Sequence, residues 1–365
     1  MLQITGIFMS IAVYLAEGQS SQRDMLQSLQ SLKPHYPLQI IASHRHQRPE
    51  ILSCADIAYQ EPYDAKLAKT QHDKTQQIKN RCEFVINHAK KHHAKVLLTG
   101  RNSADYEPYR TMLSKQGIRL LTGAIGSDML AKINNKSEFT EYCQQHNINV
   151  ATAWQFNNID ELKALLKQNQ QILLCVKPVS GIFAQGFWKL YCDDDLDSFE
   201  HLYMTDNKNI TLSQFISAYE HSLKMQTKPI PMLLMPYLSG REYSIDVVCE
   251  RGEVLGAVTR YKKGNVQYLG YDSDVMAVVI PLIRLFGCDG IVSVQTKADD
   301  TGKHHVLEIN SRPSGGIGYT VHSGVDLTQL AFLYFSGLID KPNLTKISEK
   351  IQPCAVRPLM TSVKI

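Results

Sequence analysis

The sequence predicts an α/β protein in which an open, mostly parallel sheet is followed by a mixed α+β region. Two observations carry this prediction. Short apolar runs alternate with amphipathic helical patterns over the first 125 or so residues, whereas longer strands and a β-meander dominate the last third. The length of 365 residues is enough for two or three compact units with cores of their own.

Four apolar runs in the N-terminal region are expected to form strands: one near residues 8–16, then "LQIIAS", "KVLLTG" and "IRLLTG". Helical patterns follow the first run through Leu32 and cover residues 73–93. Strands that alternate with helices usually pair in parallel, so one open sheet is expected here. No Lys or Arg precedes the first run and Glu17 ends it, which favours a buried strand over a signal peptide or a membrane span.

Helical and strand patterns alternate again in the middle of the chain. "KSEFTEYCQQH" predicts an amphipathic helix that ends at Asn147, and "DELKALLKQN" predicts a second helix capped by Asp160. "ILLCVKP" predicts a strand, and "SGIFAQG" a glycine-bearing turn into the next one.

The last third begins with "MLLMPYLSGREYSIDVVCERGEVLGAVTRYK", which predicts a strand and a meander that turns at Arg251 and Gly252. "IVSVQTKADDTGKHHVLEINSR" predicts a hairpin. A helix over residues 327–336 is expected to start at Asp326 and stop at Gly337.

Charge and cysteine content narrow the class of protein. The net charge of +4, from 39 Lys and Arg against 35 Asp and Glu, is too small to indicate nucleic-acid binding. Eight cysteines are scattered without a C-x-x-C pair, so we expect reduced thiols and a cytoplasmic protein. His88 and His92 stand at helical spacing, but no third ligand or H-E-x-x-H glutamate accompanies them to make a zinc site.

The stretch "VLEINSRPSGGIG" carries the strongest chemical signal. Glu308, Asn310 and Arg312 alternate with apolar residues, so their side chains are expected on one face of a strand. If the preceding hairpin has a two-residue loop at Thr301 and Gly302, Gln295 lies directly opposite Glu308; a four-residue loop would also keep them on one face, but a three-residue loop would not.

Oxygen donors from Gln295, Glu308 and Asn310 suit Mg²⁺, which leaves much of its coordination shell to phosphates and water. Arg312 adds a positive fork for phosphate or carboxylate. The alternative is a half-exposed strand with a polar face in water. Poor strand formers in the row and the glycines that follow it, which would let backbone approach a ligand closely, favour the metal site.

Two lysines and a loop suit a polyphosphate ligand. Lys177 ends a strand beside a turn bracketed by Gly181 and Gly186, where it can neutralise phosphates while the loop closes. Lys136 opens a helix and can hold a second phosphate. Taken singly, each lysine would be a surface residue by default.

The strand-to-loop backbone of Met235, Pro236, Tyr237 and Leu238 offers groups for the edge of a purine, with Glu242 as an acceptor for ribose hydroxyls. Arg260, in "VTRYKKG", is a candidate for holding an acid substrate, although a structural arginine on the meander is the alternative.

These motifs follow one another along the chain in the order seen in ATP-grasp enzymes, so the sequence resembles that family. The block "VLEINSRPSGGIGYTVHSGVDLTQLAFLYFSG" is similar to the large chain of carbamoyl-phosphate synthase and to related carboxylate–amine ligases, and the first loop "SSQRD" resembles ATP-grasp proteins of tellurium-resistance gene clusters. The resemblance implies a pre-grasp domain over residues 1–125, an ATP-grasp small subdomain over 126–235, a C-terminal subdomain with the metal site over 236–345, and a tail over 346–365.

The resemblance also implies roles. Lys136 and Lys177 would bind ATP phosphates, residues 235–238 adenine, and Glu242 ribose. Gln295, Glu308 and Asn310 would hold one or two Mg²⁺ ions, with Mn²⁺ as an alternative, and Arg312 would steady an acyl phosphate. The loop "SGIFAQG" has fewer glycines than is usual in the family, and Pro236 stands where the family often has Glu.

The implied activity is ATP-dependent ligation of a small-molecule carboxylate to an amine. No nucleic-acid or membrane partner is expected, and a homodimer is compatible with the sequence. Two alternatives remain: a phosphotransferase on the same fold, and a non-catalytic ATP-binding protein. The first would use the same site residues, so only its products would differ.

Overall fold

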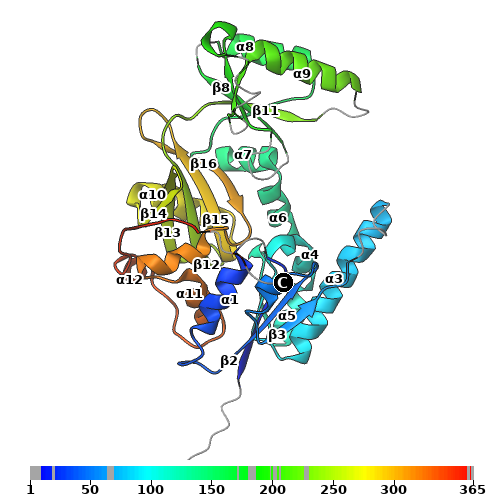
Figure 1. The fold of residues 1–365 in the computed structure, drawn as a ribbon, viewed down its shortest axis with the longest axis vertical. Coiled ribbons are helices and arrows are strands. Elements are labelled where there is room, and N and C mark those ends of the chain that lie inside the picture. Colours follow the sequence, from blue (N-terminus) through cyan, green and yellow to red (C-terminus); the bar gives the residue numbers. More distant parts are fainter. Residues whose placement is uncertain are drawn as a thin grey trace, which may run out of the picture. The chain divides into compact units, whose positions relative to one another are not determined.

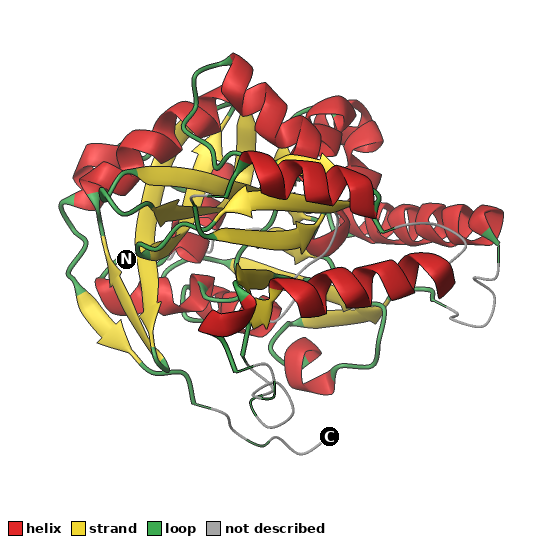
Figure 2. Cartoon of the chain, turned by 90° about the horizontal axis from the view of Figure 1, so that it is seen from above, coloured by secondary structure: helices red, strands yellow, loops and turns green. Residues whose placement is uncertain are grey.

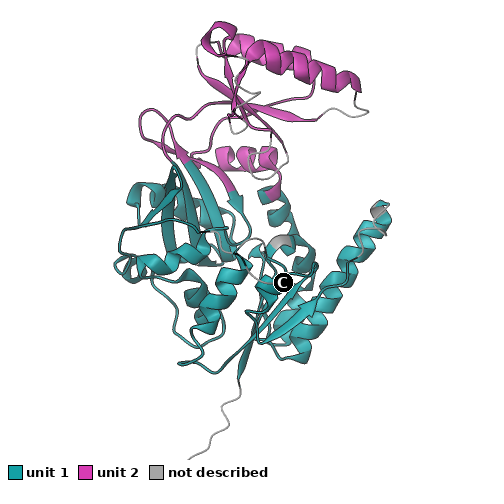
Figure 3. Cartoon of the chain, viewed as in Figure 1, with its two compact units in different colours: residues 1–133, 242–296, 309–365 teal, residues 134–241, 297–308 magenta. Residues whose placement is uncertain are grey.

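A computed structural model describes residues 10–18, 21–63, 70–170, 172–179, 186–197, 199, 204, 207–225, 230–359 and 362. The chain divides into two compact units, shown in Figure 3. Unit 1 comprises residues 1–133, 242–296 and 309–365, and unit 2 comprises residues 134–241 and 297–308. None of the helices in the described part of the chain combines the length and the hydropathy that a membrane span requires.

The first sheet, in unit 1, has the strand order β3-β2-β1-β4-β5 and is parallel throughout (Figure 1). Its strands are β1 (Ile11–Leu15), β2 (Leu38–His44), β3 (Ile57–Gln60), β4 (Val96–Leu98) and β5 (Arg119–Leu121). Both faces are covered, because Val13 and Leu15 belong to one buried cluster and Tyr14 to another. This explains why the strand sequences are continuous apolar runs.

Helices connect these strands, and Figure 2 distinguishes the helices and strands of the chain by colour. They are α1 (Gln22–Gln30), α2 (Pro49–Leu52), α3 (Gln71–Lys91), α4 (Ser103–Tyr106) and α5 (Arg110–Lys115), with 3-10 turns η1 (Gly100–Asn102) and η2 (Glu107–Tyr109). Helix α3 begins with a capping box, in which Thr70 and Asp73 each bond the other's backbone amide. The predicted strand-helix alternation is confirmed for this region.

The sheet of unit 2 has the order β10-β9-β8-β11-β7, from β7 (Trp154–Phe156), β8 (Leu174–Pro178), β9 (Trp188–Tyr191), β10 (Asn209–Thr211) and β11 (Met232–Pro236). Helices α8 (Ile159–Gln168) and α9 (Leu212–Met225) cover one face (Figure 1), where Phe156, Val176 and Leu234 form the core. The unit also contains α7 (Lys136–Gln145) and the 3-10 turn η3 (Asp193–Asp195).

The third sheet has the order β16-β15-β12-β13-β14-β17, and β6 (Gly123–Ala124) pairs with β15. Its other strands are β12 (Glu242–Glu250), β13 (Glu253–Lys263), β14 (Val266–Gly270), β15 (Cys288–Ala298), β16 (His304–Asn310) and β17 (Cys354–Val356). The remaining elements are α6 (Ser127–Asn134), α10 (Ser273–Leu285), η5 (Ile317–Ser323), α11 (Leu327–Phe335) and α12 (Leu344–Ser348).

Several local predictions are confirmed. Arg251 and Gly252 form the β12–β13 turn with positive φ angles of 47° and 84°. Asp326 caps α11 by accepting the amides of Thr328 and Gln329. All eight cysteines are free.

One local prediction is wrong, and the hairpin loop takes the length that does not support the expected pairing of Gln295 with Glu308. Helix α8 is capped by Asn158, whose side chain accepts the amide of Glu161, and Asp160 lies in the first turn instead. Asn is also a good capping residue. Asn158 stands directly before the helix, where its side chain can accept the backbone amide of the third helical residue. The loop of the β15–β16 hairpin has three residues instead of two, because the Asp299 amide donates to the carbonyl of Lys303 and the Asp299 carbonyl accepts from Gly302.

The two units cut across the contiguous segments expected from the sequence. In unit 1, one buried cluster contains Val13 and Leu26 of the N-terminal domain together with Leu255, Leu327 and Phe332 near the end of the chain. The N-terminal sheet and the last helices therefore share a core, which no boundary at residue 125 would reveal.

Candidate functional site

The polar row lies at the end of β16. Glu308 and Asn310 are half-buried, and Ile309 between them is buried. The burial is not a simple alternation, because Leu307 is half-buried and Val306, on the face of Glu308, is buried. Arg312 follows directly, and its guanidinium lies 3.5 Å from the side-chain oxygen of Asn310 and 3.5 Å from the carbonyl of Pro313, at the outer limit of hydrogen bonding.

The hairpin loop weakens the argument that grouped Gln295 with Glu308. Asp299 and Lys303 flank a three-residue loop in which Gly302 has a φ of 87°. Continued without a bulge, this register would pair Gln295 with Leu307 and not with Glu308. The assignment of Gln295 to the metal therefore rests on the family resemblance, not on the hairpin.

Gly123 holds the end of the row in place. A Cβ added at Gly123 would lie 2.4 Å from the carbonyl oxygen of Ser311, the residue between Asn310 and Arg312. Ser311 also accepts a hydrogen bond at 3.3 Å from the Ser103 hydroxyl. The row thus ends against β6 and α4 of the same unit, with glycine at the point of closest approach.

Arg312 and Pro313 line a small pocket with residues that follow the ends of β1 and β4, among them Gly18, Ser21 and Gly100. These two strands are the neighbours between which the order of the parallel sheet reverses. Ligands of open α/β sheets bind at this switch point. The pocket therefore places Arg312 beside the carboxyl ends of β1 and β4.

Arg260 is a buried residue with protein partners, only 8% exposed. Its guanidinium donates to Gln267 at 3.0 Å and to the Ser314 hydroxyl at 3.1 Å, and lies 3.6 Å from the buried carboxylate of Asp246. Gly316 packs against it, since an added Cβ would lie 2.5 Å from its Cζ atom. The glycines after the row thus admit side chains of the protein, Arg260 at Gly316 and Asp24 at Gly318.

In unit 2, Lys177 lies on the sheet face away from α8 and α9. It is half-buried and pairs with Leu233, and Cys175, two residues earlier on the same face, pairs with Met235. Cys175, Leu233 and Met235 form a separate small core there. Burial raises the pKa of the Cys175 thiol to about 11, although Lys177 and two other lysines act to lower it.

Those two other lysines are functional candidates that the sequence analysis missed. The ammonium group of Lys189 lies 4.2 Å from the ring centroid of Tyr237, and that of Lys297 lies 4.7 Å from it. Lys189 is paired with Cys175 across β8 and β9. Strand alternation around Lys177 could have indicated Lys189, but Lys297 reaches Tyr237 only through the tertiary fold.

The other candidates in unit 2 are only partly described. Gly181 lies outside the described residues. Gly186 has a φ of 70°, and a Cβ there would lie 2.7 Å from the ring of Pro178. Lys136 is the first residue of α7, directly after the capping Asn135.

Two backbone amides of residues 235–238 are not free to donate to a ligand. Pro236 has no amide hydrogen, and the Tyr237 amide donates to the carbonyl of Leu173 at 2.7 Å. Leu238 is half-buried beside them, and Glu242 is exposed at the start of β12 in unit 1.

The donor set is consistent with magnesium and not with a carboxylate- or thiolate-rich metal site. Among the described residues, no group of three or more His, Cys, Asp and Glu side chains could hold a metal ion. Glu308 contributes one carboxylate and Asn310 one amide oxygen to the same strand face. Mg²⁺ tolerates so few protein ligands because it keeps waters and phosphate oxygens.

Comparisons with known proteins agree with this picture. Residues 228–359 match the family model described as "ATP-grasp in the biosynthetic pathway with Ter operon". The structure is similar to a biotin carboxylase from Campylobacter jejuni (TM-score 0.62, 14% identity, 93% of this chain and 73% of that chain). A search of curated proteins found no match.

Two further solved structures are similar. One is an L-amino acid ligase from Bacillus licheniformis (TM-score 0.59, 14% identity, 94% of this chain and 78% of that chain). The other is the ADP complex of an N5-carboxyaminoimidazole synthetase from Staphylococcus aureus (TM-score 0.61, 12% identity, 92% and 78%).

Residues 228–359 match the ATP-grasp family associated with Ter operons, and the fold of the chain is similar to that of the solved structures named above. The matched segment contains β12 to β17 with the polar row. The expected resemblance to ATP-grasp proteins, including the Ter-associated group, is confirmed for this segment. Resemblance to carbamoyl-phosphate synthase in particular stays a prediction.

Proposed function

We propose that the protein is a Mg²⁺-dependent ligase that activates a small-molecule carboxylate with ATP and joins it to an amine. The observation that carries this proposal is the row at the end of β16: Glu308 and Asn310 share a strand face, and Arg312 follows beside the switch point of the N-terminal sheet. This row lies inside the segment that matches the ATP-grasp family.

Unit 2 would bind the nucleotide. Lys177 and Lys136 would pair with its phosphates, because each is a half-buried lysine at the end or start of a regular element. With Pro236 lacking an amide hydrogen and the Tyr237 amide bonded to Leu173, the Leu238 amide is the proposed donor to the base. The ring of Tyr237, with Lys189 and Lys297 near it, would form one wall.

Ligands bound in similar structures support the choice of nucleotide and metal. The biotin carboxylase from Campylobacter jejuni is a complex with β,γ-ATP, and the similar biotin carboxylase domain of a 2-oxoglutarate carboxylase is a complex with ADP, magnesium and bicarbonate. Glu308 and Asn310, with Gln295 by family resemblance, would hold Mg²⁺, which would neutralise the charge that develops on the phosphates.

The proposed reaction has two steps. A carboxylate oxygen of the substrate attacks the γ-phosphorus of ATP, which forms an acyl phosphate and releases ADP. The amine nitrogen then attacks the acyl carbon, and phosphate leaves as the amide bond forms. Arg312 would hold the acyl phosphate through its fork of N–H donors, and Arg260 would position the Ser314 loop through the hydrogen bond that it already makes.

The direct test is ADP release by the purified protein with ATP, Mg²⁺ and panels of carboxylates and amines, with the products identified by mass spectrometry. An amide product with one equivalent each of ADP and phosphate supports ligation. A phosphorylated acceptor that persists when amines are present would instead support the phosphotransferase, and ATP binding without turnover across the panel would support a non-catalytic role.

Two variants test the site. Glu308→Gln should reduce ADP release roughly 100-fold, since a metal ligand supplies several kcal/mol of transition-state stabilisation. The matched control, Glu253→Gln, changes an exposed glutamate that pairs with Lys341 and should retain activity. Lys177→Ala should weaken ATP binding by about 1.5–3 kcal/mol, whereas the exposed Lys163→Ala should not. Unchanged turnover in Glu308→Gln would refute the metal role.

A further inference from the structure

A row of tyrosines crosses three strands of the third sheet. Tyr243 of β12 is directly opposite Tyr261 of β13, which in turn is opposite Tyr268 of β14. The ring centroids of Tyr261 and Tyr268 are 5.0 Å apart with the rings stacked at 9°, and those of Tyr243 and Tyr261 are 5.4 Å apart at 63°. Such pairs stabilise a sheet, and the face of an aromatic ring is the negative pole of its quadrupole.

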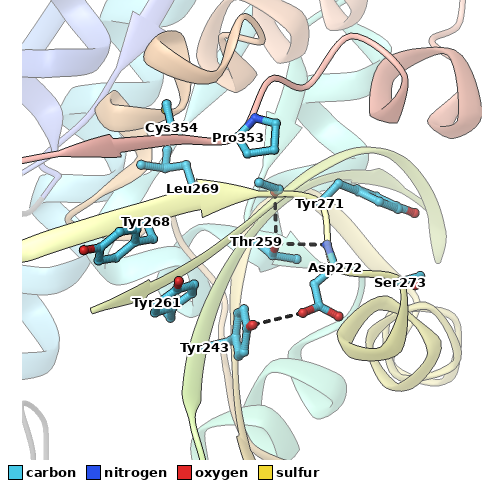
Figure 4. A pocket seen from close by; sticks show the side chains of 11 residues that line it. Tyr243, Thr259, Tyr261, Tyr268, Leu269, Tyr271, Asp272, Ser273, Pro353 and Cys354 are labelled. Atoms are coloured by element: carbon cyan, nitrogen blue, oxygen red, sulfur yellow. Dashed lines mark hydrogen bonds between the residues drawn. The ribbon is translucent and has the colours of Figure 1, made fainter. Parts of the chain in front are cut away.

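The row forms one side of a cavity of about 570 Å³, which Figure 4 shows from close by. Tyr271 is a fourth tyrosine in its lining, and Pro353 and Cys354 also line the cavity. None of the described residues that line the cavity is Lys, Arg or His. A volume of this order accommodates a small organic group.

One carboxylate lies in this lining. Asp272 precedes α10, and its Oδ1 atom accepts the amides of Asp274 and Val275 as the helix cap. Its Oδ2 atom accepts the Tyr243 hydroxyl at 2.9 Å, so the carboxylate is held toward the tyrosine row (Figure 4). Because an ionised carboxylate has about four acceptor sites and Oδ1 already accepts two amides, Oδ2 has one site left for a further hydrogen bond.

The cavity is separate from the proposed ligase site. Thr259 and Tyr261 line it, whereas Arg260 between them donates to Ser314 on the opposite face of the same sheet. Tyr243 likewise lines the cavity, and Glu242 before it faces the other way by alternation.

We propose that this cavity binds an organic cation, an alkylammonium or guanidinium group, between the tyrosine row and Asp272. The faces of aromatic rings attract cations, and a buried or half-buried carboxylate supplies a charged hydrogen-bond acceptor. The described lining residues include no positive group that would hold a phosphate or a carboxylate. This proposal does not depend on the proposed ligase function, because the cavity and the tyrosine row lie on the sheet face opposite to Arg260 and Ser314.

The test uses the full chain without nucleotide. The protein carries ring-labelled tyrosine and is titrated with n-butylguanidinium chloride or n-butylammonium chloride, with n-butanol and sodium chloride as controls. Saturable NMR shifts are expected for a subset of tyrosine rings, and these resonances are assigned by their loss in single variants at positions 243, 261 and 268. A saturable response only to the cations supports the proposal.

Variants distinguish binding from sheet stability. Asp272→Asn keeps an oxygen to cap α10 and should weaken cation binding about tenfold, the loss of one charged partner. The control Asp274→Asn removes an exposed charge from the same helical turn outside the cavity and should leave affinity within about twofold. Tyr268→Phe should retain binding and Tyr268→Leu lose it, because the ring face and not the hydroxyl attracts the cation.

Three outcomes would overturn the proposal. The first is no saturable shift with either cation. The second is an equal response to n-butanol, which would indicate an apolar crevice only. The third is equal weakening by Asp274→Asn and Asp272→Asn, which would indicate a general effect of charge and no specific site.

Discussion

Gly123→Ala tests whether the end of the polar row depends on one close backbone contact. Gly123 has a φ of 89°, and a Cβ there would lie 2.4 Å from the Ser311 oxygen and 2.6 Å from its carbonyl carbon and Cα atoms. Cβ contacts under 3.0 Å essentially do not occur, and the atoms met are backbone, which cannot rotate away. The strand end that carries Asn310 and Arg312 would have to move.

The expected cost has two parts. A left-handed conformation costs a non-glycine residue about 1–2 kcal/mol, and forcing an extra methyl group into a packed site costs about 1–3 kcal/mol more. The total is therefore about 2–5 kcal/mol of unfolding free energy. Gly117 supplies the matched control: its φ is 73°, but a Cβ there meets nothing within 4 Å, so Gly117→Ala should cost only the conformational part.

Urea unfolding followed by far-ultraviolet circular dichroism measures both variants against the natural sequence. Gly123→Ala should be less stable than Gly117→Ala by about 1–3 kcal/mol. If the chain is the proposed ligase, Gly123→Ala should also lose ADP release that Gly117→Ala retains. Equal stability of the two variants would refute the close contact as the reason for glycine at position 123.

Two further changes probe charges near the row. Arg260→Met leaves the buried Asp246 carboxylate without its counter-charge, and that carboxylate has no hydrogen-bond partner in the described part of the chain. Urea unfolding should show a loss of about 3–5 kcal/mol of unfolding free energy, partly restored by Asp246→Asn in the same chain. A loss under about 1 kcal/mol would contradict the pairing. A hydrogen bond from His305 holds the pKa of Asp299 well below its usual range. Because that pKa is depressed on folding, the ionised carboxylate stabilises the hairpin above the ordinary aspartate pKa, and this stability is lost as pH falls. Amide exchange over residues 299–305 should therefore be faster in Asp299→Asn than in the natural sequence at about pH 6. This difference should shrink below about pH 4. A difference that is constant with pH would show that the carboxylate charge does not stabilise the loop.

Local features were predictable because their causes are local. The β12–β13 turn needs two residues that accept positive φ, and Arg251-Gly252 provides the glycine. The cap of α11 needs a short acceptor side chain, which Asp326 supplies. Asn158 and Asp160 both offer a short acceptor side chain near the start of α8, and the prediction selected the wrong one of the two.

Register and long-range partners were not predictable in this way. The hairpin sequence allows loops of two, three or four residues, and a three-residue loop continued without a bulge would put Gln295 on the other face relative to Glu308. Arg260 looked like a substrate ligand on the meander, but the fold brings Asp246, Gln267 and Ser314 around it. Lys297 and Tyr237 are likewise neighbours only in the folded chain.

By itself, therefore, the sequence determined the alternation of strands and helices in the N-terminal region, the resemblance of residues 228–359 to ATP-grasp proteins, and the strand face shared by Glu308 and Asn310. Side-chain alternation and helix caps depend on residues a few positions apart, so they can be seen in the chain. The tertiary structure alone decided that Gly123 touches Ser311, that Arg260 is buried, and that Tyr243, Tyr261 and Tyr268 form a row. Those contacts depend on strand register and on a shared core, which distant segments set together when they pack.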